Sequence, residues 1–165
     1  MTCQTEIAVS PAQIRQVLGH FPSGVTVITA VYDGEPVGFT CQSFASLSLD
    51  PPMVTFAPSR TSSTWPKIRQ AGTFCVNVLS DAHSGLSMAF GRSGADKFAG
   101  VRWRSSPQGA PVLDGVVAYV ECRIWAEYNG GDHTIVAASV LDLAAYSTRR
   151  PLVLYRGQYG MPGPE

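Results

Sequence analysis

An alternation of side-chain types along residues 116–128 constrains the fold more strongly than any other feature of this chain. One set of alternate positions is apolar, and the other mixes aromatic with charged side chains. The first set is Val116, Ala118, Val120, Cys122, Ile124, Ala126 and Tyr128, and the second is Val117, Tyr119, Glu121, Arg123, Trp125 and Glu127. Successive side chains of a β-strand point to opposite faces of its sheet. The pattern therefore predicts one long strand with an apolar face and an amphipathic face.

Turn and strand signals along the rest of the chain predict further β-structure. The Asn-Gly-Gly-Asp sequence at 129–132 is a turn signal that leads into a second long strand at 133–143. Runs of β-branched and aromatic residues predict strands at 24–32, 37–41, 53–57, 73–79 and 151–155. Asp33 and Gly34 predict a hairpin turn between the first two of these runs.

Three short helices are predicted beside the strands. The first begins at Ser10 and Pro11, a hydroxyl N-cap followed by proline, and ends near 19–20. Its apolar residues lie at helical spacing and predict one apolar face, formed by Ile14, Val17, Leu18 and Phe21. The second helix covers 65–71, and the third runs from an Asp81 cap to Phe90.

Residues 93–115 contain many Gly, Pro and Ser residues without a clear period, so they are predicted to be mostly loop, anchored by Trp103 and Leu113. Long strands joined by turns, with few helices, predict a mainly β fold, an antiparallel barrel with helical decorations. A doubly wound parallel sheet needs a regular strand–helix alternation that the second half lacks. At 165 residues we expect a single domain over 1–165, with its core at about 14–159.

Charge and composition exclude several classes of partner. The net charge is zero and no Lys/Arg cluster occurs, so neither nucleic acid nor an anionic membrane surface is an expected partner. Residues 1–6 lack the features of a secretory signal, and no apolar run approaches the ~20 residues needed to cross a bilayer. We therefore expect a soluble cytoplasmic protein. Only 15% of the residues are charged, which suggests a surface partly hidden in an oligomer or hollowed by an apolar pocket.

The cysteines and the common cofactor motifs narrow the chemistry. Cys3, Cys41, Cys75 and Cys122 are far apart, so scattered buried thiols are expected and no metal site is predicted. The chain contains no G-x-G, no phosphate-binding G-x-x-x-x-G-K-[ST] loop and no G-x-S-x-G nucleophile motif. These absences argue against a Rossmann dinucleotide site and a serine hydrolase.

Two hydroxyl-rich segments flank the predicted strand at 53–57. The second runs through Ser59, Thr61 and Ser62 to the helix start at Trp65. Free backbone N–H groups, small hydroxyls and the nearby Arg60 at a helix N-terminus favour binding of a phosphate. From composition alone, the alternative that these residues form turns and cap a helix is the simpler one.

An ordered set of short motifs resembles the short-chain flavin reductases, the small components of two-component flavin monooxygenases. The motifs span about 21–159 and comprise FPSGVTVIT at 21–29, GFT at 38–40, SFxS at 43–46, PP at 51–52, 59–64, FCVNVL at 74–79, KF at 97–98, GDHTI at 131–135 and PLxxY at 151–155. The resemblance implies an FMN-binding split β-barrel, usually a homodimer with the flavin near the subunit interface. It also implies reduction of FAD or FMN by NADH or NADPH, with reduced flavin passed to a separate monooxygenase.

The resemblance also assigns cofactor-binding residues. Those along the isoalloxazine and ribityl chain are Gly38, Phe39, Thr40, Cys41, Gln42 and Ser43, and those around the flavin phosphate are Ala57, Pro58, Ser59, Ser62, Ser63 and Thr64. Phe90 and Gly91 are expected to approach the flavin from the third helix. His133 matches an element associated with the nicotinamide, and Tyr155 a C-terminal aromatic near the site. Many relatives carry Ser or Thr where this chain has Cys41 and Gln42, so contacts there are expected to differ.

The two cofactors supply the reactive groups for hydride transfer, so no obligatory catalytic residue is predicted. Without the resemblance, His133 is more simply a turn histidine. Two other functions remain open: a split-barrel FMN oxidase of the pyridoxamine-phosphate-oxidase type and a non-enzymatic flavin-binding protein. The sequence does not decide between FAD and FMN, between NADH and NADPH, or between a bound flavin and a released product.

Overall fold

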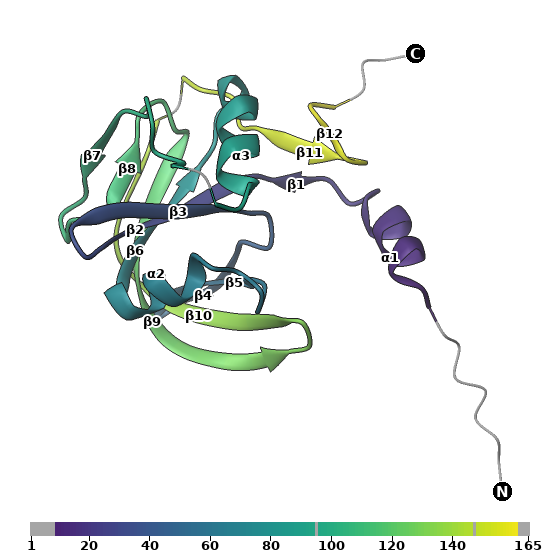
Figure 1. The fold of residues 1–165 in the computed structure, drawn as a ribbon, viewed down its shortest axis with the longest axis horizontal. Helices are drawn as coiled ribbons and strands as arrows, with labels where there is room; N and C mark the ends of the chain where they lie inside the picture. Colours follow the sequence, from purple (N-terminus) through teal and green to yellow (C-terminus); the bar gives the residue numbers. More distant parts are fainter. Residues whose placement is uncertain (1–8, 95, 147, 162–165) are drawn as a thin grey trace, which may run out of the picture.

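The computed structural model describes residues 9–94, 96–146 and 148–161, which form one large antiparallel sheet and two small ones (Figure 1). The large sheet has the order β3-β2-β6-β9-β10-β5-β4. Its strands are β2 (Thr26–Tyr32), β3 (Glu35–Cys41), β4 (Ala45–Leu49), β5 (Pro52–Phe56), β6 (Thr73–Val78), β9 (Ala118–Gly130) and β10 (His133–Ala145). The small sheets contain β1 (Ser23–Gly24), β11 (Val153–Tyr155) and β12 (Gln158–Tyr159), and β7 (Trp103–Ser105) with β8 (Pro111–Leu113).

Three short helices complete the fold: α1 (Pro11–Leu18), α2 (Trp65–Ala71) and α3 (Ser84–Gly91), the last preceded by the 3-10 turn η1 (Asp81–His83). Every strand pair in the three sheets is antiparallel. The sheet is strongly curled, with β3 and β4 at its two ends (Figure 1). The prediction of a mainly β, antiparallel split barrel with a few short helices is confirmed.

The β9–β10 hairpin is the longest pairing in the molecule and confirms the two long strands. It runs from His133 opposite Gly130 to Ala145 opposite Ala118, with register shifts near Ala137 and Val140. β9 begins at Ala118, two residues later than the sequence pattern indicated. The hairpin turn at Asp33 and Gly34 is also confirmed, since both residues have positive φ and join Tyr32 to its partner Glu35.

Both faces of the curled sheet are covered in its central part. On one face, Phe56, Phe74 and Trp65 pack edge to face, and Ile68 of α2 is fully buried beside them. Burial of such side chains stabilises the fold by roughly 1.5–3 kcal/mol each. The other face packs against α3 and β8.

The amphipathic face of β9 is not simply exposed to water. Glu121 is fully buried, accepts a hydrogen bond from the Ser106 hydroxyl and accepts a second from the Gln108 N–H at 3.0 Å. Tyr119 on the same face is 6% exposed. The segment that follows β7 therefore supplies the donors that a buried carboxylate requires.

The described residues of 93–115 are mostly loop, as predicted, but β7 and β8 form a hairpin within them that the sequence pattern did not predict. Its anchor is the buried Asn77 of β6, whose Oδ1 accepts from the Leu113 N–H at 2.8 Å and whose Nδ2 donates to the Pro111 carbonyl at 3.3 Å. Leu113 is buried as expected, whereas Trp103 is 37% exposed. The hairpin leaves no local signal in the sequence, because it is anchored by a side chain far away along the chain.

Other strand boundaries also differ from the prediction, because they too depend on partners distant in sequence. The predicted strand at 24–32 is divided between β1, which pairs with β11, and β2, which pairs with β3 and β6. The short strands β4 and β12 were not predicted and lie at the edges of their sheets. Short edge strands depend on their neighbours more than on their own composition.

Helix α1 begins as predicted but does not pack as its pattern suggests. Ser10 and Gln13 form a reciprocal capping box. The apolar face is present in the sequence, yet Ile14, Val17 and Leu18 are between 46% and 66% exposed, and the helix buries no residue. Figure 1 shows α1 projecting from the sheet beside the β11–β12 arm.

The predicted buried thiols are confirmed for Cys41, Cys75 and Cys122, which are free and buried. Cys3 lies outside the described residues, as do residues 1–6 and the last four residues of the tail. Burial raises the pKa of Cys75 and of Cys122 to about 12, so both are neutral thiols. Within the described ranges, none of the helices has the length and apolar character required to span a membrane.

Candidate functional site

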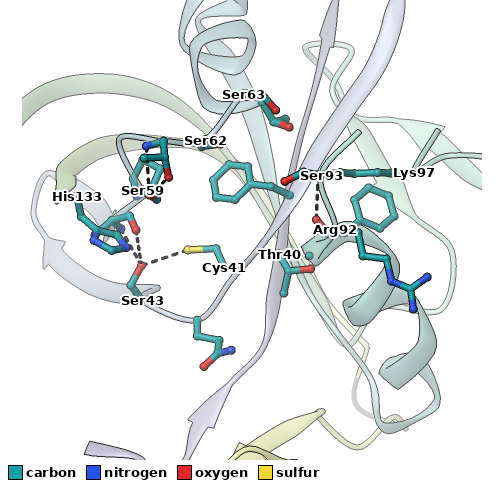
Figure 2. Close-up of a pocket in the computed structure, with 18 residues that line it drawn as sticks. Thr40, Cys41, Ser43, Ser59, Ser62, Ser63, Arg92, Ser93, Lys97 and His133 are labelled. Carbon is teal, nitrogen blue, oxygen red and sulfur yellow. Dashed lines mark hydrogen bonds between the residues drawn. The ribbon is translucent and has the colours of Figure 1, made fainter. Parts of the chain in front are cut away.

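A cavity of about 450 Å³ lies where the end of β3 faces the segment that follows β5 (Figure 2). We call it the main cavity. It is lined by every residue assigned to a cofactor above except Gly38 and Tyr155: Phe39, Thr40, Cys41, Gln42, Ser43, Ala57, Pro58, Ser59, Ser62, Ser63, Thr64, Phe90, Gly91 and His133. Four further residues line it that the sequence analysis did not assign, Thr61, Arg92, Ser93 and Lys97. The fold thus brings together four segments distant in sequence, while the cofactor-binding roles remain predictions.

The end of β3 forms the first wall of the main cavity. The Thr40 hydroxyl donates to the Ser87 carbonyl at 2.6 Å and so fixes α3 against the strand. The Ser43 hydroxyl accepts from the Ala57 N–H at 2.8 Å, and the Cys41 sulfur lies 3.2 Å from the same hydroxyl. Burial raises the pKa of the Cys41 thiol, so this wall carries polar groups without charge.

The loop at 59–64 forms a second wall and presents several hydroxyls. Ser59 and Thr61 are joined through their hydroxyls at 2.9 Å, and the Ser62 hydroxyl accepts from the Trp65 N–H at 3.1 Å. Within the described part of the chain, the N–H groups of Ser63 and Thr64 have no acceptor. Amide donors and hydroxyls gathered in one loop are suited to bind a phosphate.

The structure does not bear out the expectation that Arg60 helps this loop to bind a phosphate. Its Nη2 donates to the Asn129 side-chain oxygen at 2.7 Å, and its Nε to the His133 carbonyl at 3.4 Å. Arg60 does not line the main cavity. It connects the loop to the β9–β10 hairpin because both lie at the same edge of the fold.

His133 is the first residue of β10 and lines the main cavity, because contacts between the loop and the β9–β10 hairpin hold it there. It forms an isolated bridge with Ser59, and the Thr134 N–H donates to the Pro58 carbonyl at 3.0 Å. Nδ1 of His133 lies 2.7 Å from the Asp132 carboxylate. The hydrogen bond with His133 lowers the pKa of Asp132, and the charge of His133 lowers it further. The ionised carboxylate holds the ring through one nitrogen and leaves Nε2 available for a ligand.

The residues that follow α3 form the last wall and carry its positive charge. Lys97 Nζ donates to the carbonyls of Gly38 at 3.2 Å and Phe90 at 3.0 Å, and Figure 2 shows its side chain at the cavity edge. Burial lowers the pKa of Lys97. The Lys-Phe pair at 97–98 was part of the family resemblance, so a sequence signal for this residue existed although no role was assigned to it.

Gly38 and Tyr155 stand apart from the main cavity. A Cβ atom on Gly38 would lie 2.9 Å from both the Ile28 carbonyl oxygen and Phe90 Cε1, so glycine allows the Phe90 ring to pack on β3. Gly38 itself lines an adjoining cavity. Tyr155 lines a separate cavity on the β11–β12 arm, and within one chain it is not brought to the predicted site.

The arrangement is suited to binding a flat polar molecule that carries a phosphate. Hydroxyls, backbone N–H groups and the cations of Arg92 and Lys97 line the main cavity, and none of the carboxylates among the described residues lines it. In the ranges 9–94, 96–146 and 148–161, no group of three His, Cys, Asp or Glu side chains could hold a metal ion.

Comparison with known proteins gives consistent matches over nearly the whole chain. Residues 18–162 match the family described as flavin reductase like domain. The reductase subunit HsaB of a flavin-dependent monooxygenase from Rhodococcus jostii is 47% identical over 152 residues, covering 92% of this chain and 78% of the relative. Nitrilotriacetate monooxygenase component B from Mycobacterium thermoresistibile has a solved structure that superimposes with a TM-score of 0.87 at 44% identity, over 93% of this chain and 91% of that one. The NADH:FAD oxidoreductase SgcE6 of Streptomyces globisporus, solved with NAD and FAD fragments, has a TM-score of 0.87 at 34% identity, over 96% and 98%.

Proposed function

This chain belongs to the flavin reductase like domain family, and from that premise we propose that it is an NAD(P)H-dependent flavin reductase that supplies reduced FAD or FMN to a separate flavin-dependent monooxygenase. The observation that carries the proposal is the gathering of the predicted flavin-binding residues, except Gly38 and Tyr155, around one cavity. Relatives of similar length and fold carry reductase names, which supports the same activity here.

The chain's own residues have binding and orienting roles in this reaction. A flavin held here would supply its N5 atom as the acceptor of the hydride from the nicotinamide, and the protein would bind and orient the two rings. The N–H groups of Ser63 and Thr64, with the Ser62 hydroxyl, are placed to hold the flavin phosphate. The wall from Thr40 to Ser43 offers neutral polar groups beside the ring, which favours negative charge there without a charged acid. We assign the orientation of the nicotinamide to His133, which lines the main cavity and whose ring is held by Asp132.

The direct test is aerobic turnover of the purified protein with each pair of flavin and nicotinamide nucleotide. We expect NADH or NADPH to be consumed only when FAD or FMN is present, with no third substrate. A protein that binds flavin without oxidising either nucleotide would instead be a flavin-binding protein. A requirement for an amine substrate would indicate the pyridoxamine-phosphate-oxidase type.

Replacing both Ser62 and Ser63 with alanine tests the phosphate-binding loop. Each lost hydrogen bond is expected to cost about 1 kcal/mol of flavin binding, or roughly a fivefold rise in Kd. The control is Ser46→Ala on β4, because Ser46 does not line the main cavity. Equal flavin affinity for the double variant and for Ser46→Ala would contradict the assignment of the loop.

We further propose that the protein is a homodimer in which a second copy covers the apolar face of α1. An isolated helix of eight residues is unstable in water, and α1 buries none of its residues within the part of the chain that the structure describes. The β11–β12 arm carries Tyr155, which the family resemblance assigns to the site but which one chain holds away from it. A second copy that receives this arm would account for both observations.

The oligomeric state can be measured by light scattering on a size-exclusion column. We expect twice the chain mass for the wild type and a monomer for Val17→Glu. The control is Gln16→Glu, which adds one negative charge to the same helix outside its apolar face. A monomeric wild type would contradict the dimer.

We also propose that the protein acts in the cytoplasm, because its described thiols are free.

A further inference from the structure

A separate cavity of about 380 Å³ lies where the β7–β8 hairpin meets the segment that follows β10. We call it the arginine cavity, because its charged lining consists of Arg102, Arg104, Arg149 and Asp114. None of the residues that line it also lines the main cavity. Figure 1 shows the hairpin on the side of the molecule opposite α1. The arginine cavity is therefore a second place at which a ligand can bind.

Positive charge is concentrated in the arginine cavity, although the chain as a whole has a net charge of zero. Of the charged groups in the described residues, three guanidinium groups and one carboxylate line it. The carboxylate of Asp114 pairs with Arg102 at 2.8 Å, whereas Arg104 and Arg149 form no ion pair within the described part of the chain. Asp142 accepts a hydrogen bond from a buried tyrosine and does not line the cavity. Two positive charges thus face the cavity without a carboxylate partner.

Tyr146 holds the guanidinium groups of Arg104 and Arg149 in place. Its hydroxyl accepts a hydrogen bond from Arg104 Nη2 at 2.8 Å, and the centroid of its ring lies 5.2 Å from the guanidinium carbon of Arg149. The Arg104 guanidinium also lies over the Tyr119 ring at 5.1 Å, and Arg149 Nη1 donates to the Val116 carbonyl at 2.7 Å. In these contacts each guanidinium uses one of its five N–H donors. Donors that are already positioned lower the entropic cost of binding a ligand.

The floor of the arginine cavity is rigid because it is buried. Val112, Leu113 and Val116 line the cavity and are 1–2% exposed. The Leu113 N–H anchors β8 to β6, and the Tyr146 N–H donates to the Val117 carbonyl at 2.7 Å. The guanidinium groups therefore extend from backbone that the fold holds fixed.

The chemistry of the lining indicates the class of ligand. The planar fork of a guanidinium group matches the oxygens of a carboxylate or a phosphate and binds them through paired hydrogen bonds. Two positive charges without a carboxylate partner attract a ligand with two negative charges more strongly than a ligand with one. A volume of about 380 Å³ is in the range of small-molecule sites.

We propose that the arginine cavity binds a small dianion, either a dicarboxylate or a phosphate monoester. Arg104 and Arg149 bind its oxygens, and Tyr146 positions their guanidinium groups. The proposal goes beyond the proposed function and does not depend on it, because it uses no residue of the main cavity.

The first experiment is isothermal titration calorimetry of the wild type at low salt and about pH 8, with inorganic phosphate, succinate and acetate as separate probes. Phosphate and succinate are dianions at this pH, and acetate is a monoanion. We expect the Kd for phosphate or for succinate to be at least about tenfold lower than the Kd for acetate. Tighter binding of phosphate would assign the site to phosphate monoesters, and tighter binding of succinate to dicarboxylates. Binding of acetate as tightly as both dianions, or no binding of either dianion, would overturn the proposal.

The second experiment repeats the titration of the preferred dianion with variants. Arg104→Gln and Arg149→Gln should each raise its Kd about tenfold, and Tyr146→Phe, which keeps the ring, about threefold. The matched control is Arg123→Gln, which removes the same charge from an exposed position on β9 outside the cavity. Its Kd should stay within about twofold of the wild-type value, and circular dichroism verifies that each variant is folded. Equal Kd values for Arg104→Gln, Arg149→Gln and Arg123→Gln would overturn the proposal.

Phosphate has a second possible place of binding, the loop at 59–64 in the main cavity. The double variant Ser62→Ala/Ser63→Ala removes two hydroxyls from that loop and separates the two sites. Phosphate binding that persists in the double variant and weakens in Arg104→Gln supports the arginine cavity. Phosphate binding that weakens in the double variant and is unchanged in Arg104→Gln would place the ion at the loop and overturn a phosphate site in the arginine cavity.

Discussion

Replacing Gly38 with alanine is expected to disturb both the packing of α3 and the main cavity. The new Cβ atom would lie 2.9 Å from the Ile28 carbonyl oxygen and 2.9 Å from Phe90 Cε1. Ile28 lies on β2 between β3 and β6, so its backbone is held by the sheet and the Phe90 ring must move. Because Phe90 is fully buried and lines the main cavity, its displacement changes the shape of that cavity. Insertion of one methyl group into a packed core costs about 1–3 kcal/mol.

Urea unfolding followed by circular dichroism measures this cost, and calorimetry with FMN measures its effect on the cavity. We expect Gly38→Ala to lower the free energy of unfolding by about 1–3 kcal/mol and to weaken FMN binding. Gly85→Ala is the matched control, since Gly85 lies on the same helix as Phe90 and a Cβ there meets nothing within 4 Å. This control should gain about 0.4–1 kcal/mol through its less flexible unfolded chain. A Gly38→Ala variant with wild-type stability and FMN affinity would refute the argument.

Three further perturbations test single contacts. Asn77→Leu removes the acceptor of the buried Leu113 N–H and should lower the free energy of unfolding by about 2–4 kcal/mol in urea titrations; wild-type stability would contradict that anchor. Arg60→Ala should release the loop from the β10 start and raise both the FMN Kd and the KM for NADH, each up to about fivefold, so unchanged values of both would show that Arg60 does not hold the loop to His133. Burial lowers the pKa of His83 below its ordinary value of 6.5, so the unfolded chain binds more protons and stability should fall as the pH falls below about 6.5. Thermal unfolding of His83→Asn should show a smaller loss in this range, and an equal loss would exclude His83.

The main cavity lies at the place where the curled sheet remains open. β3 and β4 end the strand order and do not pair with each other. The hydrogen bond between Ser43 and Ala57 joins the two sides by a side chain instead of a strand ladder. An open seam leaves backbone groups free to bind a ligand, whereas a closed ladder would occupy them.

The sequence pattern of α1 predicts the helix correctly, but it does not predict what covers the apolar face of that helix. The spacing of Ile14, Val17 and Leu18 identifies an amphipathic helix, and the helix is present. The pattern does not specify which surface covers that face. No surface formed by residues 9–94, 96–146 and 148–161 of one chain covers it, which is why we look to a second copy.

Local sequence determined the features that depend on residues close to one another along the chain. The alternation in β9, the turn at Asp33 and Gly34, and the capping box at Ser10 are of this kind, because backbone geometry and short-range hydrogen bonds decide them. The family resemblance additionally predicted segments, distant from one another in sequence, that line the main cavity.

Only the tertiary structure decided which polar groups distant in sequence form hydrogen bonds with each other. The burial of Glu121 depends on Ser106 and Gln108, and the place of Lys97 depends on the carbonyls of Gly38 and Phe90. Composition cannot predict such pairs, because a buried polar group accepts any partner that the fold brings within about 3 Å. The main cavity has the same origin, since it exists only where β3, the loop after β5, the segment after α3 and the start of β10 meet.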